Sequence, residues 1–240
     1  MAVNPRGAEL PEGSAPTLSV VAPLYLNAET LEELVERVRR SLDGLNWELI
    51  LVDDASPDGS GARAETLAAA DARLMVVRLS ENGGQNEALR QGVRRSRGRQ
   101  VAFIDADLQD PPEILRELVA ASAGCELVFG IRQGPYQSWP RRLSSWLYKA
   151  LRSRLCRVPA GAGLLLVGDG ELLRAVAREA PRPCWWIPQL GARRPRIGAI
   201  AVERRRRPRG VSAYRGLMRF KVALPELWQA LRLRWGGEQR

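Results

Sequence analysis

Acidic and amide side chains directly follow a short hydrophobic run near the middle of the sequence. Residues 101–104 predict a buried strand, and Asp105, Asp107 and Gln109 come at alternate positions after it. Because alternate residues of an extended chain point to the same side, we expect these side chains to converge if the strand conformation continues. Their oxygens suit Mg²⁺ or Mn²⁺, and Mg²⁺ usually completes its shell with water and substrate phosphates. The spacing therefore predicts a metal-bridged diphosphate, unless the acids only form a turn that caps the next helix.

A second acidic pair follows another hydrophobic run. Residues 47–52 predict a strand, Asp53 and Asp54 come directly after it, and residues 56–59 have the composition of a turn. A carboxylate in this position can accept hydrogen bonds from a nucleobase or a ribose, or it can simply stabilise the turn. Ligands of parallel sheets bind beyond the carboxyl ends of the strands. Acidic clusters at two strand ends therefore favour one shared binding site.

Hydrophobic periodicity indicates the elements that must position these acids. It predicts strands at residues 18–22, 47–52, 74–79, 101–104 and 126–129, and helices at 29–42, 62–72, 86–97 and from Pro111 onward. We expect the first strand to end at Pro23. Strand and helix alternate with short links, which predicts an α/β domain with a mainly parallel central sheet flanked by helices.

The composition excludes several functional classes. The chain has 240 residues, of which 45% are hydrophobic and 27% charged, the ordinary mix of a globular protein. It contains no histidine, which excludes Ser-His-Asp triads, histidine-based zinc sites and histidine general bases. The three cysteines form no CxxC pair, so we expect neither a disulfide framework nor a zinc site. We expect the protein to work in a reducing compartment.

We expect neither a membrane-spanning helix nor a signal peptide in this sequence. No uncharged apolar run approaches the ~20 residues of a spanning helix, and the first residues lack the apolar core of a signal peptide. We expect residues 1–16, rich in Pro, Gly and Glu, to form a disordered tail.

Charge is divided unevenly along the chain. The formal net charge is +10, but residues 1–132 hold 14 Lys or Arg against 21 Asp or Glu, whereas residues 133–240 hold 23 against 6. Six of the seven Trp also lie after residue 132. An acidic half joined to a half rich in Arg and Trp indicates two tasks, of which the second involves an anionic partner.

Two stretches of the basic half carry apolar residues at helical spacing. These are residues 143–155 and 214–235, and we expect Pro225 to break the second helix. Both could be interfacial helices that dock on a membrane surface or on a separate membrane subunit, or core-packing helices with solvated Arg side chains. The chain has no zinc-finger spacing and no RNA-binding string, so we do not expect nucleic acid as a partner.

Five ordered motifs together resemble a known family. They read VVAPLYLNAETL, VDDASPDGS, LSENGGQNEALRQG, FIDADLQDPPE and VFGIR, and a further element runs from Arg204 to Tyr214. The chain resembles the inverting family-2 glycosyltransferases of GT-A fold, the nucleotide-diphospho-sugar transferase fold. The similarity is greatest to dolichol-phosphate mannose synthases and bacterial undecaprenyl-phosphate glycosyltransferases.

The resemblance implies a role for particular residues. Those expected to bind the nucleotide are Pro23, Tyr25, Asn27, Asp54 and Asp105. Those expected to hold the metal are Asp105, Asp107 and Gln109. Those expected to bind the phosphates or the acceptor are Arg132, Arg204, Arg207 and Ser212, and the residues expected to act in catalysis are Asp105, Asp107 and Arg132.

The implied activity is transfer of a sugar, with inversion, from a nucleotide-sugar donor to a polyprenyl phosphate, either undecaprenyl or dolichyl. We expect Mg²⁺ or Mn²⁺ as the cofactor and a peripheral location on the cytoplasmic face of a membrane. A hydroxyl acceptor needs a general base, whereas a phosphate is already an anion and needs only positioning, which arginines supply. A chain with many arginines and no histidine therefore fits a phosphate acceptor better.

Two further functions stay open. The acceptor could be a hydroxyl group, or the chain could be a non-catalytic homologue that binds nucleotide or lipid phosphate as a subunit. The second alternative rests on two departures from the family pattern, because an acid and an arginine common in relatives correspond here to Gly161 and Leu166.

We divide the chain into a tail (1–16), a nucleotide-sugar-binding half (17–132), an acceptor-side region with an interfacial helix (133–203) and an Arg-rich element with amphipathic helices (204–240).

Overall fold

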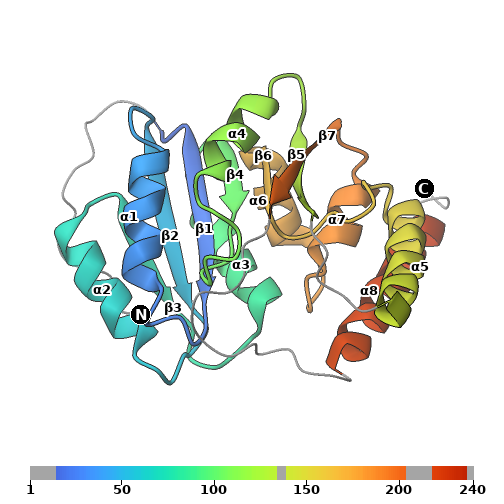
Figure 1. Ribbon diagram of the computed structural model, residues 1–240, viewed down its shortest axis with the longest axis horizontal. Helices are drawn as coiled ribbons and strands as arrows, with labels where there is room; N and C mark the ends of the chain where they lie inside the picture. Colours follow the sequence, from blue (N-terminus) through green and yellow to red (C-terminus); the bar gives the residue numbers. More distant parts are fainter. Residues whose placement is uncertain (1–14, 134–138, 204–217, 237–240) are drawn as a thin grey trace.

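One seven-stranded sheet runs through the molecule (Figure 1). The computed structural model describes residues 15–133, 139–203 and 218–236. The strand order is β3-β2-β1-β4-β6-β5-β7, and β6 alone runs antiparallel to its neighbours. The strands are β1 Leu18–Leu24, β2 Trp47–Asp53, β3 Leu74–Arg78, β4 Gln100–Phe103, β5 Leu127–Gln133, β6 Leu166–Asp169 and β7 Ile197–Glu203. The predicted α/β class with a mainly parallel sheet is confirmed.

Helices cover both faces of the sheet and extend beyond one edge (Figure 1). One face packs against α1 Leu31–Ser41, α2 Ser60–Ala70 and α4 Ile114–Ala121. The other packs against α3 Gln85–Val93, α6 Gly170–Glu179 and α7 Trp186–Ala192. The last two helices, α5 Trp139–Cys156 and α8 Met218–Gly236, contact each other and α7 at the end of the sheet that carries β7.

Apolar side chains on both faces explain why the inner strands are buried. All seven residues of β2 are buried, and all but Glu48 and Asp53 are apolar, as expected for a parallel strand covered on both sides. In β1, Val20 and Ala22 face the α1 layer, and Val21 faces the α3 layer. The helix α1 completes its layer with Leu31 and three further apolar residues at helical spacing, Leu34, Val35 and Val38.

The predicted first strand, residues 18–22 ended by Pro23, is two residues too short. The strand β1 continues to Leu24, and Pro23 pairs in register with Val52 of β2. The backbone of Val21 faces β4, since its carbonyl accepts from Ile104 N–H, and two residues later Pro23 faces the same way. The ladder to β4 has ended at Val21, so a residue without an N–H costs no hydrogen bond there.

The expected break at Pro225 is also wrong, because α8 runs through this residue. A proline removes one backbone donor and crowds the preceding turn, but the helix can continue past it. The side chains described beyond Pro225 show why continuation is favourable. Glu226 and Ala230, one turn apart, are both buried.

A glycine on α3 sets how closely this helix approaches the sheet. A Cβ atom on Gly92 would lie 2.3 Å from Val21 Cγ1 and 2.9 Å from Val52 Cγ2. Any side chain there would push α3 away from β1 and β2. Because Gln85 begins α3, this spacing also fixes the loop that precedes the helix.

We expect Gly92→Ala to lower the free energy of unfolding by about 1–3 kcal/mol, because overpacking in a close-packed core forces backbone shifts. Urea unfolding followed by circular dichroism measures the change. The matched control is Gly163→Ala, whose Cβ would meet no atom within 4 Å. Equal stability of the two variants would contradict this account of the α3 packing.

Candidate functional site

The loops that follow β1, β2 and β4 share an unusual backbone feature. Leu26, Ala55 and Leu108 have φ values of 59°, 52° and 58°, although none of them is glycine. This left-handed conformation costs free energy for residues with a side chain and collects at functional sites. All three residues lie beyond the carboxyl ends of parallel strands, where sheets of this class bind ligands.

The loops after β1 and β2 are clamped together by short polar side chains. Asp58 accepts a hydrogen bond from Ala28 N–H at 2.9 Å and from the hydroxyls of Ser56 and Ser60 at 2.6 and 2.5 Å. In return, Ser56 accepts from Leu26 N–H at 2.8 Å. The segment that holds Tyr25 and Asn27, both predicted to bind a nucleotide, is therefore built onto the turn after β2.

Tyr25 and Asn27, both predicted to bind the nucleotide, differ in exposure, because Tyr25 is exposed and Asn27 is half-buried. Tyr25 is 39% exposed, and its N–H donates to Asn27 Oδ1 at 2.8 Å. Pro23 lies within β1. The phenol is thus presented to solvent, while Asn27 shapes the turn that presents it.

Asp54 holds the loop before α3. Its two oxygens accept hydrogen bonds from Gly83 N–H at 2.7 Å and Gly84 N–H at 2.9 Å. Burial raises the pKa of this carboxyl, and the two backbone donors oppose the rise. The geometry shows Asp54 as a link between the end of β2 and the loop at 82–85. Its role toward a nucleotide stays a prediction.

Asp105 is joined to the same loop from the other side. Its Oδ1 accepts from Gln85 Nε2 at 2.5 Å, and its Oδ2 lies 2.7 Å from the Arg132 guanidinium. Burial raises the pKa of Asp105, and the positive charge of Arg132 opposes that shift. Asp54 bonds the backbone of Gly83 and Gly84, the adjacent Gln85 bonds Asp105, and Asp105 bonds Arg132. Through this loop, Asp54, Gln85, Asp105 and Arg132 form one bonded series that connects the ends of β2 and β4 to β5.

Arg132 has a second carboxylate partner that the sequence analysis did not single out. Asp110 is fully buried, and both of its oxygens accept hydrogen bonds from Arg132, the Nε bonds being 3.0 and 3.1 Å long. Gln85 is likewise a residue of the site that the sequence analysis did not predict. The run of acids after β4 could have drawn attention to Asp110, but no spacing in the sequence predicts its contact with Arg132.

The expected extended conformation after β4 is wrong. The strand ends at Phe103, and residues 106–110 form turns and bends in which Leu108 is left-handed. Gln109 N–H donates to Asp107 Oδ1 at 3.1 Å, a local bond that an extended chain would not allow. Asp105, Asp107 and Gln109 are therefore brought near one another by a turn and not by strand alternation.

The donor chemistry of this turn fits a hard divalent cation. Two carboxylates and an amide oxygen lie within five residues, and all are oxygen ligands. Among the residues that the structure describes, no three or more His, Cys, Asp or Glu side chains gather into a metal-holding group. A cation here would need oxygens from water or substrate to complete its shell, as Mg²⁺ commonly does.

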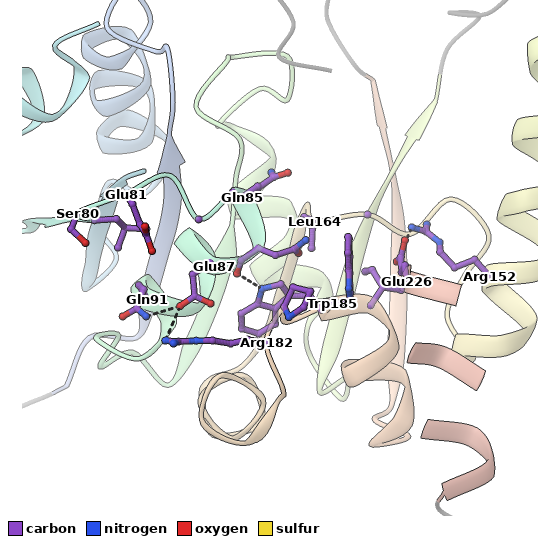
Figure 2. A pocket seen from close by; sticks show the side chains of 18 residues that line it. Ser80, Glu81, Gln85, Glu87, Gln91, Arg152, Leu164, Arg182, Trp185 and Glu226 are labelled. Atoms are coloured by element: carbon purple, nitrogen blue, oxygen red, sulfur yellow. Dashed lines mark hydrogen bonds and ion pairs between the residues drawn. The ribbon is translucent and has the colours of Figure 1, made fainter. Parts of the chain in front are cut away.

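A cavity of about 710 Å³ is lined by side chains that include Gln85 of the bonded series. Figure 2 shows the residues around it. Gln85 lies on its wall, so the cavity adjoins the residue that holds Asp105. Trp185 and Leu164 line the middle, and Arg152 and Glu226 line the side opposite Glu87 and Arg182. The lining residues come from α3, α5, α7, α8 and the loops before α3, β6 and α7.

The remaining predicted ligands cannot be placed. Arg204, Arg207 and Ser212 lie outside the described residues. Arg132 is the described member of the predicted phosphate-binding set, and it lies at the carboxylate cluster.

We expect the Asp58 clamp to make stability depend on pH at the acidic end. Burial alone would raise the pKa of Asp58, but hydrogen bonds from Ser56, Ser60 and Ala28 outweigh it and lower the pKa to about 2. The stabilisation is therefore complete above the ordinary value near 3.8 and is lost as pH falls toward 2. For this exposed carboxylate it amounts to about 1 kcal/mol or less.

Chemical denaturation of the wild type and of Asp58→Asn at pH 6, 4 and 2 tests this effect. The difference in unfolding free energy should be largest at pH 6 and smallest at pH 2, where the folded-state carboxyl begins to take up its proton. A difference that does not change with pH would show that the charge of Asp58 does not hold the loops together.

Comparison with known proteins agrees with this arrangement. The family model described as glycosyl transferase family 2 matches residues 19–166. The dolichol-phosphate mannosyltransferase of Pyrococcus furiosus is 35% identical over 127 residues, which are 51% of this chain and 36% of the relative. The undecaprenyl-phosphate 4-deoxy-4-formamido-L-arabinose transferase of Aeromonas hydrophila is 36% identical over 165 residues, 67% of this chain and 49% of the relative. The chain thus spans less than half the length of either relative.

Solved structures share the fold at lower identity. Glucosyl-3-phosphoglycerate synthase from Mycobacterium tuberculosis has a TM-score of 0.64 and 24% identity, over 92% of this chain and 80% of that chain. A mannosyltransferase from Pyrobaculum calidifontis has a TM-score of 0.60 and 19% identity, over 92% and 70%. With the family model covering more than half of its length, the chain belongs to glycosyl transferase family 2 and has the GT-A fold.

Proposed function

We propose that this chain transfers a sugar from a nucleotide-sugar donor to a polyprenyl phosphate, with inversion and with a divalent cation. The observation that carries the proposal is the bonded series of Asp54, Gln85, Asp105 and Arg132 at one edge of the sheet. It places Asp105, an expected metal ligand, beside an arginine able to bind phosphate, and Gln85 of the same series lines the neighbouring cavity.

The donor is proposed to lie over the clamped loops after β1 and β2. The solved mannosyltransferase that shares the fold is in complex with GDP-Man and Mn²⁺, and the synthase is in complex with Mn²⁺, UDP and glucosyl-3-phosphoglycerate. Tyr25 offers an exposed ring for a base, and the nearby backbone is held by Asp58. A rigid loop of this kind binds a flat base without a large ordering cost.

Asp105 and Asp107, with the amide oxygen of Gln109, would hold Mg²⁺ or Mn²⁺. When bound, the cation supplies positive charge that stabilises the departing nucleoside diphosphate. Arg132 adds a second positive charge at the same place. Its burial disfavours the charged form, but Asp105 and Asp110 outweigh this and raise its pKa, so the guanidinium stays ionised.

The acceptor is proposed to be a lipid phosphate because its anion needs no general base. The chain has no histidine to act as one. The curated relatives are named for transfer involving dolichol phosphate and undecaprenyl phosphate. Positioning and charge relief by arginine forks are what such an acceptor requires.

A non-catalytic binding role is the second candidate, and one observation favours it. Leu166, where relatives commonly have an arginine, is fully buried in the core, and Gly161 carries no side chain. The loop between these residues therefore supplies no charge to the cavity. Turnover with the wild-type chain decides between the two candidates.

We expect Asp107→Ala to lower sugar transfer at least about 100-fold, because the cation and the charge it neutralises act mainly in the transition state. Transfer from a panel of nucleotide sugars to a short-chain polyprenyl phosphate, with Mg²⁺ or Mn²⁺, measures the loss and the anomer formed. Glu117→Ala, an exposed acid on α4, is the matched control.

Three outcomes of this assay separate the candidates. Retained transfer by folded Asp107→Ala would contradict the proposed metal site. Nucleotide binding by the wild type without turnover would favour the non-catalytic role. Better transfer to a hydroxyl acceptor than to the lipid phosphate would refute the proposed acceptor.

The membrane contact is proposed to be made by one face of α5 and α8. Leu151 on α5 is 45% exposed, and Leu224, Trp228 and Leu231 on α8 are 67%, 58% and 38% exposed. Arg232 stacks on Trp228 with 4.3 Å between its guanidinium carbon and the ring centre. Exposed apolar side chains beside cations suit the interface of an anionic membrane, here taken to be its cytoplasmic face. Within the described ranges no helix has the length and apolar character needed to span a bilayer.

We expect the double substitution Trp228→Ser and Leu231→Ser to weaken binding to vesicles of anionic phospholipid at least about fivefold, since both side chains lose apolar burial. Co-sedimentation with the vesicles at low and high salt measures the binding. The same measurement with neutral vesicles shows how much of the binding depends on charge. Unchanged sedimentation of the folded variant would place the membrane contact elsewhere, or on a separate subunit.

A further inference from the structure

The cavity beside Gln85 is amphiphilic. Its apolar wall contains Leu164, Trp185 and Ile187, and its polar end at Gln85 adjoins Asp105. At the opposite side lie Arg152 of α5 and Glu226 of α8 (Figure 2). A ligand that fills the whole space must therefore offer both an apolar part and a group that binds arginine.

Arg152 has donor capacity that its surroundings do not use. One terminal nitrogen donates to the Ala162 carbonyl, and the other lies 3.5 Å from Glu226 Oε1. Its Nε is buried and has no hydrogen-bond acceptor among the described residues. A guanidinium has five N–H donors, and leaving a buried one unsatisfied is costly. Because the Nε is itself buried, a ligand in the cavity would be bound by the terminal nitrogens, which carry N–H groups beyond these two contacts.

The guanidinium is also held in place. Glu226 is 6% exposed, and its Oε2 accepts a hydrogen bond of 2.5 Å from the Tyr148 hydroxyl. Burial raises the pKa of Tyr148, and the neighbouring Glu226 raises it further, so the hydroxyl keeps its proton. Tyr148 and Glu226 together fix an arginine whose side chain is 13% exposed. A fixed fork loses little conformational freedom when it binds phosphate.

The other cation of the lining is differently placed. Arg182 is 68% exposed and pairs with Glu87 at 3.3 Å. Glu87 in turn accepts from Gln91 at 2.8 Å. Both arginines pair with a glutamate, so Arg152 is distinguished by its burial and by an Nε that has no hydrogen-bond acceptor among the described residues.

We propose that this cavity receives the head of the polyprenyl phosphate acceptor, with Arg152 as a phosphate-binding residue and the Trp185 wall against the first isoprene units. This inference rests on the proposed function. Arg152 follows Leu151, an exposed residue of the proposed membrane face, directly in sequence. A lipid bound at that face therefore lies close to the cavity that Arg152 lines. The loop at 161–166 supplies no charge, and Arg152, bonded to the carbonyl of Ala162 in that loop, provides the cation there.

Arg152→Gln tests the proposal through the acceptor alone. The KM for a short-chain polyprenyl phosphate should rise about tenfold or more, which corresponds to losing a charge-assisted hydrogen bond. The KM for the donor and the rate of donor hydrolysis should not change. Arg154→Gln, which removes the same charge from an exposed position of α5 two residues away, should leave the acceptor KM unchanged.

Two further variants guard against misfolding. Arg152→Gln leaves Glu226 buried without its cation, so Arg152→Gln with Glu226→Gln removes both charges and keeps an acceptor for the Tyr148 hydroxyl. Arg152→Lys keeps the charge but loses the fork, and it should raise the acceptor KM less than Arg152→Gln. Circular dichroism and thermal unfolding establish that each variant is folded.

The outcomes distinguish this inference from the function on which it rests. If the wild type transfers no sugar to polyprenyl phosphate, the proposed function is refuted. If the wild type does transfer, but folded Arg152 variants have the same acceptor KM as Arg154→Gln, the inference about Arg152 is refuted and the function stands. A rise in the donor KM equal to that of the acceptor would also refute it.

Discussion

The contact of Arg132 with Asp105 and Asp110 is the interaction on which the site depends. Two carboxylates at the end of one short strand repel each other, and the guanidinium from β5 supplies the opposing charge between them. Asp110 is fully buried, so its charge is tolerated only with this partner. The site therefore requires β5 to lie close enough to β4 for Arg132 to reach these two acids, in addition to the packing that holds the two strands in one sheet.

The reversed strand between them makes this contact possible. The strand β6 begins at Leu166, opposite Phe103 of β4 and Phe129 of β5. Beyond Phe129, β5 continues to Gln133 and pairs with β7 alone. The side chain of Arg132 can therefore cross above the start of β6 and reach the acids after β4. The loop that enters β6 at this edge also forms part of the cavity wall.

Much of the fold could be predicted from the pattern of apolar residues. The strands around Val20, Leu49 and Ala102 are buried on both faces, and such strands stand out as hydrophobic runs bounded by turn residues. The rule that proline ends a strand or a helix failed at two positions where contacts with other elements determine the conformation. Pro23 is tolerated within β1 because the ladder to β4 has already ended, and Pro225 lies inside a helix that has a buried side.

By itself, the sequence determined the α/β class, the acids at two strand ends and the division into an acidic and a basic half, since each depends on residues close together in the chain. Tertiary structure alone decided the partners: Gln85 with Asp105, Arg132 with Asp110, and Arg152 with Glu226. These pairs are separated by 20 to 74 positions. No local spacing encodes such contacts, because they depend on strand order and on where one strand outruns its neighbour.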